Sequence, residues 1–149
     1  MVVVTHGQLA TELVNAAETI VGDLPQFSAV SIGWHEDVQD AREAIAAAIE
    51  RVKRPGGVLL ATDMFGGTPA NLAITFLKED AVEVVTGVNL PMLIKAASLQ
   101  EGARLTDIAR LLREHGRNAI WVASDLINGT TGADAADGAK GATGNGPAT

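Results

Sequence analysis

The chain has 149 residues, of which 47% are hydrophobic and 19% charged, which suits one globular domain with a real core. Its formal net charge of −7 argues against nucleic acid and anionic membranes as partners, and the absence of cysteine excludes disulfides, thiolate catalysis and thiolate metal sites. Since no apolar stretch approaches the roughly 20 residues of a membrane span and the first residues lack a signal-peptide pattern, we expect a cytoplasmic protein.

Four short aliphatic segments alternate with helical patterns, as is typical of strands buried on both faces of a sheet. These predicted strands cover residues 2–5, 27–32, 58–61 and 82–86. Strands that alternate with helices predict an α/β fold with a doubly wound, mainly parallel sheet and right-handed crossovers. If the strand order is 2-1-3-4, the first and third strands are neighbours, and the switch point at which such sheets bind ligands lies between them.

The segments between the strands carry apolar residues about every 3.6 positions, which predicts helices. The predicted helices cover residues 9–20, 38–52, 68–77, 89–98 and 106–115. Thr68 followed by Pro69 is typical of an N-cap and a first helical residue, and Gly116 is expected at the C-terminal end of the last helix.

The C-terminal part of the chain predicts two further features. Residues 119–122 form a short apolar run that could be a fifth strand. From Gly129 onward the composition changes to glycine, alanine, threonine and short polar residues without apolar periodicity. We therefore expect one domain over residues 1–128 and a disordered tail over residues 129–149.

His6 and Asp63 are the candidate catalytic pair. His6 directly follows the first predicted strand and Asp63 lies just beyond the third, so a 2-1-3-4 sheet places them across one crevice. Neutral imidazole is a good nucleophile. A carboxylate bonded to one ring nitrogen would fix the tautomer, leave the lone pair of the other nitrogen exposed, and stabilise the positive charge that develops on attack.

Gly66, Gly67 and Thr68 would complete the site. The two glycines allow the backbone to approach a ligand closely, and their N–H groups, with those that begin the next helix, could cradle an anion. The Thr68 hydroxyl could add a hydrogen bond. Together with His6 these residues predict transient phosphorylation of the histidine. Each of these features also has a purely structural explanation. His6 could be an ordinary turn residue and Asp63 a solvated residue at a strand end. The two glycines could form a tight turn, and Thr68 could be a helix cap.

Other candidate sites are weaker. His35 lies near the end of the second strand on the same rim, and His115 near a helix C-terminus is explained by its interaction with the helix dipole. Three scattered histidines without cysteine predict no metal site, and we expect no cofactor. The chain lacks a P-loop. It also has Thr5-His6 where a receiver domain would place acidic residues, and Thr5 where a histidine phosphatase of the phosphoglycerate-mutase type would have arginine.

Three segments carry a resemblance to a known family. They are Val-Val-Val-Thr-His-Gly at residues 2–7, Thr-Asp-Met-Phe-Gly-Gly-Thr-Pro-Ala-Asn at residues 62–71 and Gly-Val-Asn-Leu-Pro-Met at residues 87–92. In order and spacing they resemble the IIA domain of the mannose/fructose/sorbose family of the bacterial phosphoenolpyruvate-dependent sugar phosphotransferase system. The match runs from about residue 2 to residue 123. Its Phe-Gly-Gly-Thr-Pro sequence favours the sugar branch over the related subunit of dihydroxyacetone kinase.

The resemblance implies a phosphotransferase with a phosphohistidine intermediate. His6 would accept a phosphoryl group from phospho-HPr and pass it to a IIB protein for sugar uptake and phosphorylation. Asp63 would orient His6, and Gly66, Gly67 and Thr68 would line the phosphoryl pocket. The alternative is a regulatory module whose His6 phosphorylation state controls binding to a target protein, without sugar transport.

The resemblance also implies how the chain assembles. The family sheet has the order 2-1-3-4, and the family is homodimeric, with a short C-terminal antiparallel strand exchanged between subunits. In this chain that strand would be residues 117–122. Membrane contact would be only indirect, through transporter components, and these partners rather than this chain would determine which sugar is carried.

Overall fold

The computed structural model describes residues 1–99 and 102–128. The elements are β1 (Val2–His6), α1 (Leu9–Val21), β2 (Ser28–Ile32), α2 (Val38–Val52), β3 (Val58–Thr62), α3 (Thr68–Ile74), β4 (Val82–Thr86), α4 (Leu90–Ala97), α5 (Leu105–Asn118) and α6 (Ala123–Asn128). None of the helices in these ranges is long and apolar enough to cross a membrane. The predicted tail, residues 129–149, lies outside the described residues.

The four strands form one parallel sheet in the order β2-β1-β3-β4, which confirms the predicted topology. Strand β1 pairs on one side with β2, where His6 lies opposite Ile32, and on the other side with β3, where Val4 lies opposite Thr62. The switch point therefore lies between β1 and β3. His6 is the last residue of β1, which is one of the two central strands, and it lies at the carboxyl edge of the sheet.

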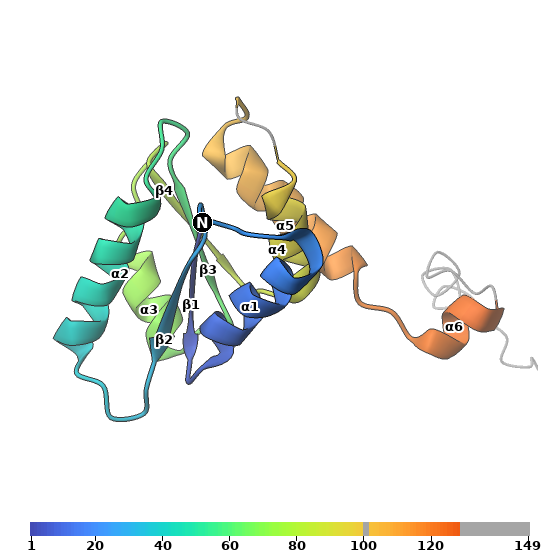
Figure 1. The fold of residues 1–149 in the computed structure, drawn as a ribbon, viewed down its shortest axis with the longest axis horizontal. Helices are drawn as coiled ribbons and strands as arrows, with labels where there is room; N and C mark the ends of the chain where they lie inside the picture. Colours follow the sequence, from blue (N-terminus) through green and yellow to red (C-terminus); the bar gives the residue numbers. More distant parts are fainter. Residues whose placement is uncertain (100–101, 129–149) are drawn as a thin grey trace, which may run out of the picture. The chain divides into compact units, whose positions relative to one another are not determined.

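Helices cover both faces of the sheet (Figure 1). Val2 and Val4 of β1 pack with α2 and α3, whereas Val3 packs with α1 and α4, because successive side chains of a strand point to opposite faces. Val2, Val3 and Val4 have no exposed surface. The aliphatic runs that predict the strands are thus explained by burial on both faces.

The start of helix α3 differs from its prediction. Thr68 is expected as the N-cap, but its backbone is already helical, and the extended residue that precedes the helix is Gly67. Pro69 is therefore the second helical residue. Proline is accepted in the first helical turn because an N–H there has no partner within the helix. The position of this proline in the sequence therefore does not determine which of the two preceding residues is the N-cap.

The end of helix α5 also differs from its prediction. Gly116 is expected at the C-terminus, but α5 continues to Asn118, and Gly116 is buried within it. A Cβ atom at Gly116 would lie 2.6 Å from Cγ and from Sδ of Met92, and the Gly116 carbonyl accepts a hydrogen bond of 3.0 Å from Nδ2 of Asn89. Glycine at this position therefore permits close packing of α5 against α4 and does not end the helix.

The expected fifth strand is not formed within the single chain. Arg117 and Asn118 belong to α5, and residues 119–122 form neither helix nor strand before α6 begins. Ile120, Trp121 and Val122 are all more than half exposed. Because a strand needs a neighbour to accept its backbone hydrogen bonds, exchange of this segment between subunits would require a second copy of the chain. Exchange therefore stays a prediction.

Candidate functional site

His6 lies at the carboxyl end of β1 on a firmly anchored turn. The hydroxyl of the fully buried Thr5 accepts a hydrogen bond of 2.6 Å from the N–H of Ala10 at the start of α1. The N–H of Gly7 donates to the carbonyl of Ile32 at 2.8 Å, which joins the turn to the end of β2. The backbone of His6 is thereby held on both sides, while its side chain remains 49% exposed.

Asp63 holds His6 through one oxygen. Its Oδ2 accepts hydrogen bonds from the backbone N–H of His6 at 3.0 Å and from ring atom Nδ1 at 2.8 Å, and its Oδ1 accepts one from the N–H of Met64 at 3.0 Å. A carboxylate acceptor at Nδ1 places the ring proton there. The lone pair of the neutral imidazole then belongs to Nε2. The structure thus brings the predicted pair together in the geometry that a nucleophilic Nε2 requires.

The charge of Asp63 is stabilised in this position. Partial burial would raise the pKa of its carboxyl group, but the hydrogen bonds from the His6 backbone and ring, the positive charge of the protonated ring and the hydrogen bond from Met64 together lower it below the ordinary value of 3.8. Asp63 is therefore a carboxylate at neutral pH. It can compensate a positive charge on the imidazole without taking up a proton.

Gly67 lies close to the His6 ring. A Cβ atom at Gly67 would lie 2.5 Å from Cε1 and 2.9 Å from Nε2 of His6, distances at which the ring would have to move. Gly66 has a φ of +85°, a backbone conformation that residues with a side chain rarely adopt, and this conformation forms the turn that precedes Gly67. The two glycines thus have different tasks, one in the turn and one in direct contact with the imidazole.

The first turn of helix α3 follows this contact directly. Its first intrahelical bond is that from the N–H of Asn71 to the carbonyl of Gly67, so the N–H groups of Thr68 and Ala70 have no acceptor within the helix. Thr68 is exposed, and none of the hydrogen bonds described for residues 1–99 and 102–128 involves its hydroxyl. Ala70 is fully buried, so the N–H that could bind an anion here is that of Thr68, directly after Gly67.

The other two histidines lie elsewhere. His35 is exposed on the loop between β2 and α2, and His115 is exposed on α5. Within the described residues, no hydrogen bond or ion pair joins either of them to His6 or Asp63. The structure thus brings together His6, Asp63 and Gly67 and leaves His35 and His115 outside their hydrogen-bond network.

Comparison with known proteins gives the family. The family model described as the PTS system fructose IIA component matches residues 1–112. The chain is 31% identical over 123 residues to the fructose-specific EIIA component of Bacillus subtilis, which covers 82% of this chain and 84% of that protein. The chain belongs to the IIA family of the bacterial sugar phosphotransferase system. Its role is therefore in sugar phosphotransfer.

Two further relatives show the same similarity. This IIA component is 36% identical over 98 residues to the sorbose-specific EIIA component of Lacticaseibacillus casei, over 65% of this chain and 70% of that protein. The solved mannose/sorbose-specific IIA subunit from Enterococcus faecalis has a TM-score of 0.72 at 28% identity, over 81% of this chain and 91% of that chain. The resemblance noted in the sequence is thus confirmed at the level of family and fold.

Exposed apolar side chains follow the same strand ends and were not predicted as part of the site. Trp34 after β2 is 94% exposed and Phe65 after β3 is 74% exposed, and Met64 and Leu9 are about half exposed. Large apolar side chains in short turns are a signal that the sequence does contain, since burial in a core cannot explain them there. We refer to these four exposed side chains, Leu9, Trp34, Met64 and Phe65, as the apolar rim.

The contact between Gly67 and His6 leads to a first prediction. Replacement Gly67→Ala should displace the imidazole and break the Nδ1 hydrogen bond to Asp63, while the free energy of unfolding changes little, because the turn is partly exposed. The nitrogen NMR signals of the His6 ring should then change from one defined tautomer to a mixture. Gly33→Ala is the matched control, since a Cβ atom there meets no atom closer than 3.9 Å. An unchanged His6 spectrum in Gly67→Ala would contradict the geometry.

The lowered pKa of Asp63 leads to a second prediction. Because its pKa is lower in the folded than in the unfolded chain, the carboxylate contributes stability above pH 3.8 that is lost as the pH falls through the folded value. The difference in unfolding free energy between the wild type and Asp63→Asn should accordingly be largest near neutral pH and should shrink below pH 3.8. Denaturant titrations across this range measure it, and a pH-independent difference would exclude the proposed linkage.

Proposed function

We propose that this IIA component is a phosphocarrier in which Nε2 of His6 accepts a phosphoryl group from phospho-HPr and passes it to a IIB protein. The hydrogen bond of 2.8 Å between Nδ1 and Asp63 carries this proposal, because it leaves the lone pair on Nε2 of an exposed ring. Family membership supports sugar phosphotransfer as the setting. No observation on the described residues favours the regulatory alternative.

The transfer requires one bond to form and one to break. The Nε2 lone pair attacks phosphorus, the bond from phosphorus to the donor breaks, and the donor keeps that electron pair. The ring retains its proton on Nδ1 and becomes positively charged. Asp63 compensates this charge in place. In the second half of the cycle the acceptor attacks phosphorus, and Nε2 recovers its lone pair.

Gly66, Gly67 and Thr68 are the proposed groups for the phosphoryl oxygens. The proximity of Gly67 to Nε2 places this turn beside the atom that would carry phosphorus. The N–H of Thr68 has no acceptor within the helix, and Thr68 is exposed. Donors in such a position could stabilise the charge that spreads over the oxygens during transfer.

The apolar rim suits a reaction in which the phosphoryl group arrives on a protein. Tryptophan and phenylalanine bury much area at modest entropic cost, and tryptophan is enriched among the residues that dominate the binding energy of protein interfaces. Trp34 and Phe65 follow β2 and β3, the two strands adjacent to the one that ends at His6. We infer that donor and acceptor dock on this rim in turn.

Phosphorylation by enzyme I, HPr and radiolabelled phosphoenolpyruvate tests the proposal. The wild type should take up acid-labile, base-stable label and His6→Ala none, while Asp63→Asn should slow transfer by roughly two to four orders of magnitude, by analogy with other oriented histidines. His35→Ala is the control with an exposed histidine outside the site, and it should be labelled like the wild type. Label that persists in His6→Ala would refute the assignment.

We further propose that the chain forms a homodimer through residues 117–122. Ile120, Trp121 and Val122 are exposed in the single chain, and pairing this segment with the sheet of a second copy would bury them and satisfy their backbone groups. Sedimentation at micromolar concentration should give about twice the monomer mass, and Trp121→Asp should shift the population toward the monomer. A wild-type monomer would refute exchange and leave the histidine chemistry unaffected.

A further inference from the structure

Two threonine side chains lie next to each other at the carboxyl edge of the sheet. Thr62 at the end of β3 is paired in register with Val4 of β1 on one side and with Thr86 at the end of β4 on the other. Residues paired in this way point to the same face of a sheet. Because His6 follows Val4 by two positions, it belongs to the next row of side chains on that face. The two hydroxyl groups therefore lie in the row directly before that of His6.

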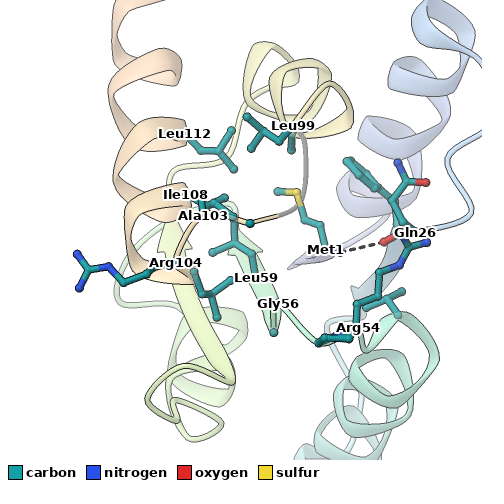
Figure 2. Close-up of a pocket in the computed structure, with 17 residues that line it drawn as sticks. Met1, Gln26, Arg54, Gly56, Leu59, Leu99, Ala103, Arg104, Ile108 and Leu112 are labelled. Atoms are coloured by element: carbon teal, nitrogen blue, oxygen red, sulfur yellow. Dashed lines mark hydrogen bonds between the residues drawn. The ribbon is translucent and has the colours of Figure 1, made fainter.

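The side chain of Thr62 points toward helix α3. Leu59 of β3 belongs to the opposite face, where it packs with Ile108 of α5 beside a pocket at the amino edge (Figure 2). Since successive side chains of a strand alternate between the faces, Leu60 and Thr62 point the other way. On that face Leu60 belongs to the same buried cluster as Ala73 of α3. Thr62 thus lies between the end of the sheet and α3.

The hydroxyl of Thr62 is buried without a partner. Thr62 has no exposed surface, and within residues 1–99 and 102–128 its Oγ1 takes part in no hydrogen bond. The other buried polar side chains of this part of the chain do have partners, since the hydroxyl of Thr5 binds the N–H of Ala10 and that of Ser28 binds the guanidinium of Arg51. Nearly all buried polar groups in proteins bind either a protein group or an ordered water. The Thr62 hydroxyl therefore requires a partner from outside the chain.

The surroundings of Thr62 suit one water molecule. Thr86 beside it is partly exposed, and no hydrogen bond of its hydroxyl is found among the described residues. Ala70 and Ala73 share one face of α3, are fully buried and bring only methyl groups to this layer. The N–H of Ala70 has no acceptor within the helix. A buried water makes about three hydrogen bonds to such polar groups, and two hydroxyls and one N–H provide them.

We propose that Thr62 is a positioning residue of the His6 site, whose hydroxyl holds, together with that of Thr86, one buried water beneath the first turn of α3. The water ties the end of β3 to this turn, which directly follows Gly67. A Cβ atom at Gly67 would lie only 2.5 Å from Cε1 of His6, so the position of the turn determines the room that the ring has. Only the effect on phosphoryl transfer rests on the proposed function, because the water and the position of the ring do not require it.

The sign of a stability change tests the water. Thr62→Val keeps the shape of the side chain and removes the hydroxyl. If the hydroxyl holds a water, its loss leaves the other partners unsatisfied, and the midpoint of thermal unfolding should fall by about 3 °C. If the hydroxyl is merely unsatisfied, valine should raise the midpoint, which would overturn the proposal. A high-resolution crystal structure should show the water within hydrogen-bond distance of Thr62 and Thr86, and its absence there would overturn the proposal as well.

The NMR signals of the His6 ring test the positioning role. They should shift in Thr62→Val and stay close to those of the wild type in Thr62→Ser, which keeps the hydroxyl. Thr11→Val is the matched control, because it removes a hydroxyl that binds Ser31 on the α1 face of the sheet, and it should leave the ring signals unchanged. Unchanged His6 signals in Thr62→Val, or equal shifts in Thr62→Ser, would contradict the role of the hydroxyl.

Phosphoryl transfer from phospho-HPr connects the positioning role to the chemistry. Thr62→Val should lower kcat about tenfold through a displaced ring and leave KM for phospho-HPr unchanged, since the apolar rim is not altered. A raised KM with unchanged kcat would overturn the positioning role. The two proposals fail separately. Label that persists in His6→Ala would refute the phosphocarrier and leave the thermal midpoint and the ring signals of the Thr62 variants as valid tests of the water.

Discussion

The pairing of β1 on both of its edges is the constraint on which the site depends. Hydrogen bonds to β2 and β3 hold this buried strand, and in a parallel sheet all carboxyl ends reach the same edge. His6 at the end of β1 and Asp63 directly after β3 are separated by 57 positions in sequence and are brought into hydrogen-bond contact by this pairing alone. The local anchors at Thr5 and Gly7 then remove the remaining freedom of the turn.

One oxygen of Asp63 binds both the backbone and the ring of His6. Its Oδ2 binds the backbone N–H of His6 and the ring nitrogen of the same residue, so any movement of the carboxylate disturbs the end of β1 and the tautomer together. Gly67 leaves room for the ring near Cε1 and Nε2, because a Cβ atom at this position would collide with it. The imidazole is therefore positioned between a charge that orients it and a backbone that excludes other orientations.

The sequence predicts the strands and the strand-end positions of His6 and Asp63, because buried aliphatic runs are properties of short segments. The strand order that brings the two residues together is implied by the family resemblance. The errors at Thr68 and Gly116 have a different origin. Proline is tolerated at more than one position of the first helical turn, and glycine has two uses, in helix ends and in close packing. Only the contact of Gly116 with Met92 in three dimensions distinguishes the two.

Other features depend on quantities that no local pattern contains. Whether residues 119–122 form a strand depends on a neighbour for their backbone groups, which the described residues of the single chain do not supply. The contact of Gly67 with His6 is intermediate, since its glycine was predicted as part of the site but its steric task became evident only from the distances.

A relay of the proposed kind would impose two opposite demands on His6. The nucleophile must be held rigidly, because a displacement of about 1 Å can lower a transfer rate by roughly a hundredfold. In the proposed cycle two different proteins would have to reach the same nitrogen in turn, so the ring cannot be enclosed. Asp63 and the backbone of β1 hold the ring in position, while the His6 side chain stays half exposed and the exposed Trp34 and Phe65 follow the neighbouring strands β2 and β3. Rigidity thus comes from the sheet and access from the loops.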